Sequence, residues 1–169
     1  MKQHLFVVPV VILMLMAGVA GLGSGATARA AVDAPITIET LGTGMPSDAP
    51  GKALLLLRVT IQPGAAFPAH IHPGTVVIAV ESGDFGFTVL EGEAIATRAV
   101  ASGTPEPAET LAVGTEAVMH AGDQVFEQAG VVHTARNAGI TPVVVLLSAL
   151  VDPSQEFLMP VETKETPAA

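Results

Sequence analysis

Histidine is the residue type with the clearest chemical potential in this sequence, and three of its five histidines fall in two places. His70 and His72 are separated by one residue, and His133 follows Gly130 much further along the chain. On a β-strand alternate side chains share a face, so His70 and His72 would point together while Ile71 points the other way. Neutral imidazole is a common ligand for zinc, copper, iron and nickel. The spacing therefore predicts a metal site whose third ligand, His133, comes from a neighbouring strand.

A second interpretation of these histidines needs no metal. A short His-x-His pattern also arises by coincidence on a surface, and His133 alone would then be a hydrogen-bonded core residue. His4 lies in an N-terminal apolar segment, and His120 faces either the interior or water on the approach to His133. Glu81 and Glu127 are the carboxylates available to join the site, although glutamate is usually solvated. The histidine spacing alone leaves both interpretations open.

The rest of the sequence predicts strands that would hold these residues. Beyond residue 31, short Val- and Ile-rich stretches alternate with Gly, Pro, Asp and Ser, and almost nothing has helical spacing. This pattern predicts an all-β fold without a helix longer than about two turns. Turn residues such as Ser82-Gly83-Asp84 and Ala121-Gly122-Asp123 indicate a run of hairpins. The expected strands are Ile36–Thr40, Ala53–Gln62, Thr75–Glu81, Phe85–Leu90, Ala94–Val100, Glu116–Ala121, Gln124–Glu127, His133–Asn137 and Val143–Leu150.

The residues that flank the histidines follow a two-part pattern. The first part contains Gly64, His70, His72 and Gly83, and the second contains Gly122, Gly130, His133 and Asn137. In its order and spacing this pattern resembles the two-motif signature of the cupin superfamily, over about Arg58 to Leu150. The sequence departs from that signature at two positions, with Val76 where a glutamate ligand is usual and Gln128 where proline is usual.

The resemblance implies a double-sheet antiparallel β-barrel, similar to a jelly roll, with one metal ion inside it. His70, His72 and His133 are the implied ligands of a divalent transition metal. Without the usual glutamate its identity is open among iron, zinc, copper, manganese and nickel, because three neutral imidazoles suit several of them. A Val76→Glu substitution is expected to tighten metal binding. Asn137 is expected to close a turn rather than to contact a ligand.

The implied interior is apolar and offers few groups that transfer protons. Its expected lining consists of Val, Ile and Leu side chains with Phe67, Phe85, Phe87 and Phe126. The sequence has no Tyr and no Cys, which leaves Glu127, Glu81 or His120 for any acid–base step. Arg58 and Arg136 are expected to form surface ion pairs. Three functions are consistent with this set: a dioxygenase-like enzyme acting on a small apolar molecule, a non-enzymatic module that binds a metal or small ligand, and a scaffold with a vestigial site. Metal binding ranks first, and enzymatic activity is left open.

The N-terminal segment predicts export. Lys2 precedes an uncharged apolar run from Leu5 to Ala20, and Ala28-Arg29-Ala30 is typical of a signal-peptide cleavage site. A mature chain that begins at Ala31 and is secreted or periplasmic is therefore expected. The alternative is an uncleaved N-terminal membrane anchor. The expected organisation is a signal peptide at 1–30, an N-terminal strand and loop at 31–51, the cupin barrel at 52–151 and a partly disordered C-terminal tail at 152–169.

Composition limits the partners. The formal net charge is −9, from 7 basic and 16 acidic residues, which disfavours nucleic acid and anionic membrane surfaces. The absence of cysteine excludes a disulfide scaffold and a thiolate metal site. The expected partner is a small molecule, with no nucleic acid and, after cleavage of the signal, no membrane. The resemblance also leaves a homodimer open.

Overall fold

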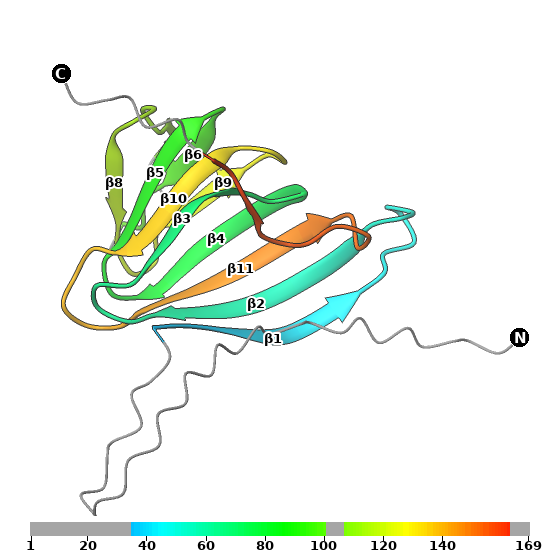
Figure 1. Cartoon of the computed structure of the whole chain (residues 1–169), viewed down its shortest axis with the longest axis horizontal. Helices are drawn as coiled ribbons and strands as arrows, with labels where there is room; N and C mark the ends of the chain where they lie inside the picture. The colour runs from blue at the N-terminus through cyan, green and yellow to red at the C-terminus, as the bar shows by residue number, and fades with distance from the viewer. Residues whose placement is uncertain (1–34, 101–106, 163–169) are drawn as a thin grey trace, which may run out of the picture. The chain divides into compact units, whose positions relative to one another are not determined.

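The structure is a computed structural model that describes residues 35–100 and 107–162. Its strands form two antiparallel sheets, of seven strands in the order β1-β2-β11-β4-β9-β6-β7 and of five strands in the order β12-β3-β10-β5-β8. The strands are β1 (Ile36–Gly44), β2 (Ala53–Ile61), β3 (Ala66–Ile71), β4 (Gly74–Ser82), β5 (Phe85–Glu91), β6 (Ala94–Thr97), β7 (Glu109–Thr110), β8 (Glu116–Met119), β9 (Gln124–Glu127), β10 (Val132–Asn137), β11 (Val143–Val151) and β12 (Met159–Pro160). Figure 1 shows β2, β11 and β4 in one layer and β3, β10 and β5 in the other.

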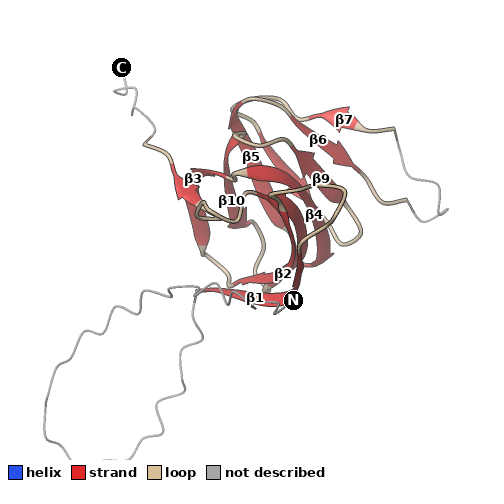
Figure 2. Cartoon of the chain, turned by 90° about the vertical axis from the view of Figure 1, so that its right-hand side faces the viewer, coloured by secondary structure: helices blue, strands red, loops and turns tan. Residues whose placement is uncertain are grey.

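The all-β, double-sheet antiparallel fold predicted from the sequence is confirmed. Each of the nine expected strands is present, and Figure 2 shows only strands and loops in the described part of the chain. No helix is found there, and so none that would cross a membrane. Strand pairing does not join the two sheets into a closed barrel, because no described strand belongs to both. The predicted signal peptide and residues 163–169 of the predicted tail lie outside the described residues.

Strand β3 carries His70 and is one of three short strands that the sequence pattern did not predict. Pro68, in its middle, has no N–H to donate to a ladder and usually argues against a strand. In the structure His70 pairs with His133 and Phe67 pairs with Ala135, with an irregular register between them. A bulge of this kind leaves backbone groups outside the ladder, so it tolerates a proline. The bulge thus lets β3 place His70 directly opposite the third histidine.

The core lies between the two sheets, and alternation along each strand decides which side chains enter it. Val125 and Glu127 of β9 are buried, whereas Phe126 between them is only partly buried. Phe126 was expected to line the interior, and this expectation is wrong because it lies on the opposite face of β9. Leu54, Leu56 and Val77 are among the exposed apolar side chains of the seven-stranded sheet.

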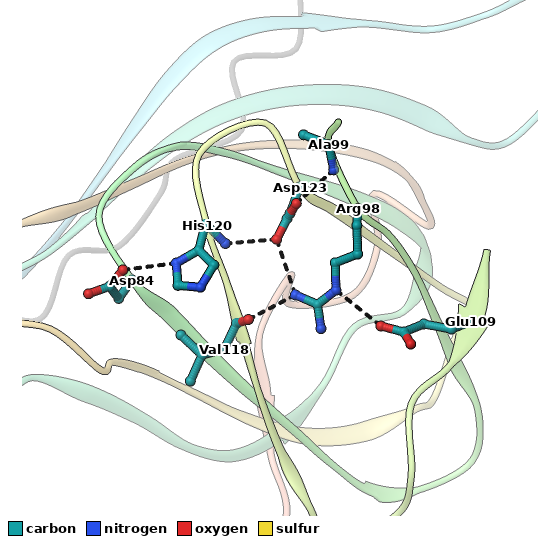
Figure 3. A network of polar contacts seen from close by, with 7 residues as sticks. All are labelled: Asp84, Arg98, Ala99, Glu109, Val118, His120 and Asp123. Atoms are coloured by element: carbon teal, nitrogen blue, oxygen red, sulfur yellow. Dashed lines mark hydrogen bonds and ion pairs between the residues drawn. The ribbon is translucent and has the colours of Figure 1, made fainter. Parts of the chain in front are cut away.

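A polar network fixes the turn that leads into β9 (Figure 3). Asp123, which is 5% exposed, accepts hydrogen bonds from the backbone N–H of Ala99 at 2.8 Å and of His120 at 2.9 Å. Arg98 donates to the same carboxylate at 3.1 Å, to the Val118 carbonyl and to Glu109. Gly122, with φ of 93°, precedes Asp123 in a left-handed conformation that glycine adopts at little cost. The network therefore fixes the start of β9, and so the position of Glu127 at the end of that strand.

Replacing Asp123 with alanine is expected to destabilise the protein by about 1–3 kcal/mol, because two backbone N–H groups and Arg98 lose a buried acceptor. Urea unfolding monitored by circular dichroism measures the change. The exposed Asp48 provides the matched control, and Asp48→Ala should alter the free energy of unfolding by less than about 0.5 kcal/mol. Equal effects of the two substitutions would contradict the role given to Asp123.

The contribution of Asp123 should also depend on pH. Burial raises the pKa of this carboxyl, but the hydrogen bonds from His120, Ala99 and Arg98 outweigh burial and lower the pKa below its usual value. A lowered folded-state pKa gives stability that is present above the ordinary carboxyl pKa and is lost as the pH falls through the folded-state value. The stability difference between the parent and Asp123→Ala should therefore shrink in acid. A difference that grows in acid would contradict this assignment.

Candidate metal centre

The structure brings the three histidines of the sequence motif to one point between the sheets. His70 lies on β3, His72 follows that strand, and His133 on β10 pairs with His70. One ring nitrogen from each of the three lies within 4.8 Å of the others. The side chains are 3%, 4% and 1% exposed, respectively. In this arrangement a single ion can contact all three histidines. Metal binding itself stays a prediction.

Backbone carbonyls orient the three rings. The Nδ1 atom lies 2.7 Å from the Pro68 carbonyl oxygen in His70 and 2.8 Å from the Phe157 carbonyl oxygen in His72. The corresponding distance from His133 to the Val131 carbonyl oxygen is 3.2 Å. A carbonyl accepts only, so Nδ1 carries the proton and donates it, and Nε2 keeps its lone pair. Hydrogen bonds of this kind fix the tautomer and orientation of imidazoles that bind metals.

Burial keeps the three imidazoles neutral. It is the main cause that lowers the pKa of His70, and it lowers the pKa of His72 to about 4 and that of His133 to about 3. Charge repulsion from the other histidines of the cluster contributes to the lowered pKa values of His72 and His133. All three rings are therefore unprotonated at neutral pH. Neutral imidazole is the form that coordinates a metal, so no proton on these three rings competes with an ion at neutral pH.

Glu127 is buried beside the same cluster. It is 1% exposed, with Oε2 3.1 Å from His133 Nδ1 and Oε1 3.7 Å from His72 Nε2. Neither oxygen has a hydrogen-bond partner in the part of the chain that the structure describes. Burial raises the pKa of Glu127 to about 8. The expectation that Glu127 is solvated is thus wrong, because alternation along β9 turns it inward, whereas Glu81 is exposed and pairs with Arg58.

A small apolar cavity adjoins the histidines. Its volume is about 40 Å³, and its lining includes Val59, Ile61, Phe85 and Phe157 together with the three imidazoles. Phe157 was not among the residues predicted for the site. Its ring stacks on His72 with centroids 4.4 Å apart, in addition to the hydrogen bond at its carbonyl. In the sequence, Phe157 begins the short apolar run Phe157-Leu158-Met159 within an otherwise polar C-terminal segment, and this run is the signal for the contact.

The other polar candidates do not reach the histidine cluster. His120 is exposed and contacts Asp84 at 3.0 Å (Figure 3), so it lies on the surface. Arg58 and Arg136 form surface ion pairs, as expected, with the carboxylates of Glu39, Glu81 and Glu116.

Asn137 closes a turn, as predicted. Its side-chain oxygen accepts a hydrogen bond from Gly139 at 2.8 Å, and its amide donates to the carbonyls of Ile61 and Thr141. This amide therefore supports the fold around the site and does not contact the histidines.

Comparisons with known proteins agree with this architecture. A crystal structure of a conserved protein with a double-stranded beta-helix domain from Klebsiella pneumoniae matches with a TM-score of 0.50 and 18% identity, over 76% of this chain and 88% of that one. Oxalate decarboxylases from Lactobacillus farciminis and Bacillus subtilis match with TM-scores of 0.39 and 0.42 and identities of 21% and 23%. Those two alignments cover 59% of this chain and 24% and 22% of the decarboxylases. At these identities the likeness concerns the fold alone.

No curated protein matches the sequence. The family model of the cupin domain matches residues 57–149, which is more than half of the chain and includes all three histidines. The two motifs, the two antiparallel sheets and this match agree, and the chain belongs to the cupin superfamily.

Proposed function

We propose that this cupin binds one divalent transition-metal ion through one ring nitrogen of each of His70, His72 and His133. The observation that carries the proposal is the convergence of three buried, neutral imidazoles whose ring nitrogens lie within 4.8 Å of one another. The donor set also passes a test of fit, because a buried carboxyl that lacks a hydrogen-bond partner in the described part of the chain lies beside it. Burying such polar groups without partners is costly, and a cation between them would offset that cost.

The side chains of this site would determine the coordination and the surroundings of a bound ion. Such an ion would supply Lewis acidity and, as iron or copper, redox chemistry with oxygen. Three imidazoles leave coordination positions for a small ligand. The apolar lining limits the entry of water, and a cavity of about 40 Å³ has room for an ion with a few waters but not for a large organic molecule.

A dioxygenase-like activity on a small apolar molecule is the second candidate. The apolar lining of the cavity favours such a ligand over a charged one, since Arg58 and Arg136 are paired with carboxylates at the surface. A non-enzymatic module that binds metal or a small ligand uses the same site without turnover. A scaffold with a vestigial site has less support, because it would keep three buried imidazoles and a buried carboxyl at a cost in stability.

Metal analysis of protein purified from its native compartment tests the proposal. One equivalent of a divalent transition metal per chain is expected, and its identity then separates oxygen chemistry (iron or copper) from hydrolytic or structural roles (zinc). Uptake of oxygen by the loaded protein in the presence of small apolar compounds would favour the enzyme over the binder. Protein that contains no metal and takes up neither zinc nor cobalt on titration would overturn the proposal and support the scaffold.

We also propose that the cupin domain acts outside the cytoplasm, as a secreted or periplasmic protein. The support is the N-terminal sequence, with Lys2 before an uncharged run and Ala28-Arg29-Ala30 at its end. N-terminal sequencing of exported protein is expected to begin at or near Ala31. A product that starts at Met1 and stays with membranes would instead support the N-terminal anchor. The small-molecule partner and the homodimer stay predictions.

A further inference from the structure

The buried carboxyl of Glu127 has no hydrogen-bond partner among the described residues, and we propose that it is the fourth protein ligand of the ion held by the three histidines. This inference rests on the proposed metal site and adds an anionic donor to it. Glu127 is 1% exposed and lies against two of the three imidazoles, and both its oxygens lack hydrogen bonds among the described residues.

The distance between Glu127 and His72 suits a direct ligand. The Nδ1 of His72 is held by the Phe157 carbonyl, so Nε2 is the nitrogen that His72 can offer. Oε1 of Glu127 lies 3.7 Å from that atom. Two donors that each bind one ion at about 2.1 Å are separated by roughly 3.0–3.5 Å. A shift of a few tenths of an ångström would therefore bring both atoms into one coordination shell.

The geometry disfavours a role for Glu127 as a hydrogen-bond acceptor that orients His133. Oε2 lies 3.1 Å from His133 Nδ1, yet the contact does not make a hydrogen bond. The Val131 carbonyl accepts from that nitrogen instead. The carboxyl is thus free of hydrogen bonds among the described residues, and Oε1 is the oxygen that lies on the side of the nitrogen that His72 would offer to an ion.

Strand register explains how a carboxylate reaches the site although Val76 stands at the expected ligand position. Val76 on β4 pairs directly with Glu127 on β9, and both side chains point inward. Directly paired residues have Cβ atoms about 4.5–5.5 Å apart, within the reach of a glutamate side chain. The carboxylate is therefore supplied by β9, next to the position on β4 where the family pattern has a glutamate. Its charge would offset part of the ion's positive charge, which three neutral imidazoles leave intact.

Zinc titration of the metal-free protein tests the inference. Glu127→Gln is expected to weaken Zn²⁺ binding by at least about 10-fold, because the loss of a ligand should cost no less than the loss of a group that only supports the ligands. The metal-free variant should unfold at or above the midpoint of the parent, because glutamine replaces a buried carboxyl of similar shape. Glu81→Gln, at an exposed carboxylate of the same sheet, is the control and should leave the affinity unchanged.

Two further measurements distinguish a direct ligand from a residue that only lies near the ion: the Co²⁺ spectrum, and a double variant that moves the carboxylate from β9 to β4. The visible absorption of the Co²⁺ protein reports its ligand set, so Glu127→Gln should change the spectrum. In the double variant Val76→Glu/Glu127→Val the carboxylate stands on β4, and it should recover most of the affinity that Glu127→Val alone loses. Parent protein that binds neither metal would overturn the metal site and this inference together. Parent protein that binds, with Glu127→Gln matching it in affinity or in Co²⁺ spectrum, would overturn the inference alone.

Discussion

Alanine at His133 is expected to abolish tight metal binding, with the affinity for Zn²⁺ falling by at least about 100-fold, more than the loss typical of a supporting group. His133 is the ligand supplied by β10, and its ring lies 4.2 Å from that of His70 and 5.3 Å from that of His72, centroid to centroid. The other two histidines come from one short segment and cannot surround an ion alone. Calorimetric titration of metal-free protein measures the change.

His120→Ala is the control for this substitution. His120 is exposed and contacts Asp84 on the surface, so its removal should leave metal affinity within about twofold of the parent. If His133→Ala binds Zn²⁺ as tightly as the parent, the two motifs do not converge on one ion. The vestigial-scaffold alternative would then replace the proposed function.

Phe87→Ala is expected to cause the largest loss of stability, about 3–5 kcal/mol. Phe87 is fully buried on β5, and its ring stacks on His133 with centroids 4.7 Å apart. Its removal leaves a cavity under that imidazole in addition to the lost apolar burial. Chemical denaturation of the metal-free protein measures the change, and the metal affinity should fall as well because His133 loses the surface that holds it.

The matched control for Phe87 is Phe126→Ala, on the outer face of β9. Phe126 is only partly buried, so its substitution should cost about 1 kcal/mol or less. A loss of unfolding free energy as large as that of Phe87→Ala would show that Phe126 is buried in the folded protein and would contradict its assignment to the outer face of the seven-stranded sheet.

The motif spacing was enough to predict the fold and the convergence of the three histidines, because the glycines fix turns and the alternation fixes faces. It could not predict β3, since Pro68 is compatible with a strand only where a bulge removes the need for its N–H. It identified Glu127 only as one of two candidate carboxylates and expected it to be solvated, because its burial depends on pairing with Val76 on a strand distant in sequence. The tightening expected from Val76→Glu needs revision for the same reason, because that substitution places two carboxylates directly opposite each other.

The hydrogen bond between His72 and Phe157 spans 85 residues. A ribosome therefore adds all three histidines before Phe157, whose carbonyl orients the His72 ring. A chain truncated ahead of Phe157 would keep its histidines and both of its motifs, yet the His72 ring would be free to turn. An ion bound at this site as proposed would therefore distinguish chains in which the segment with Phe157 has packed against His72 from chains in which it has not.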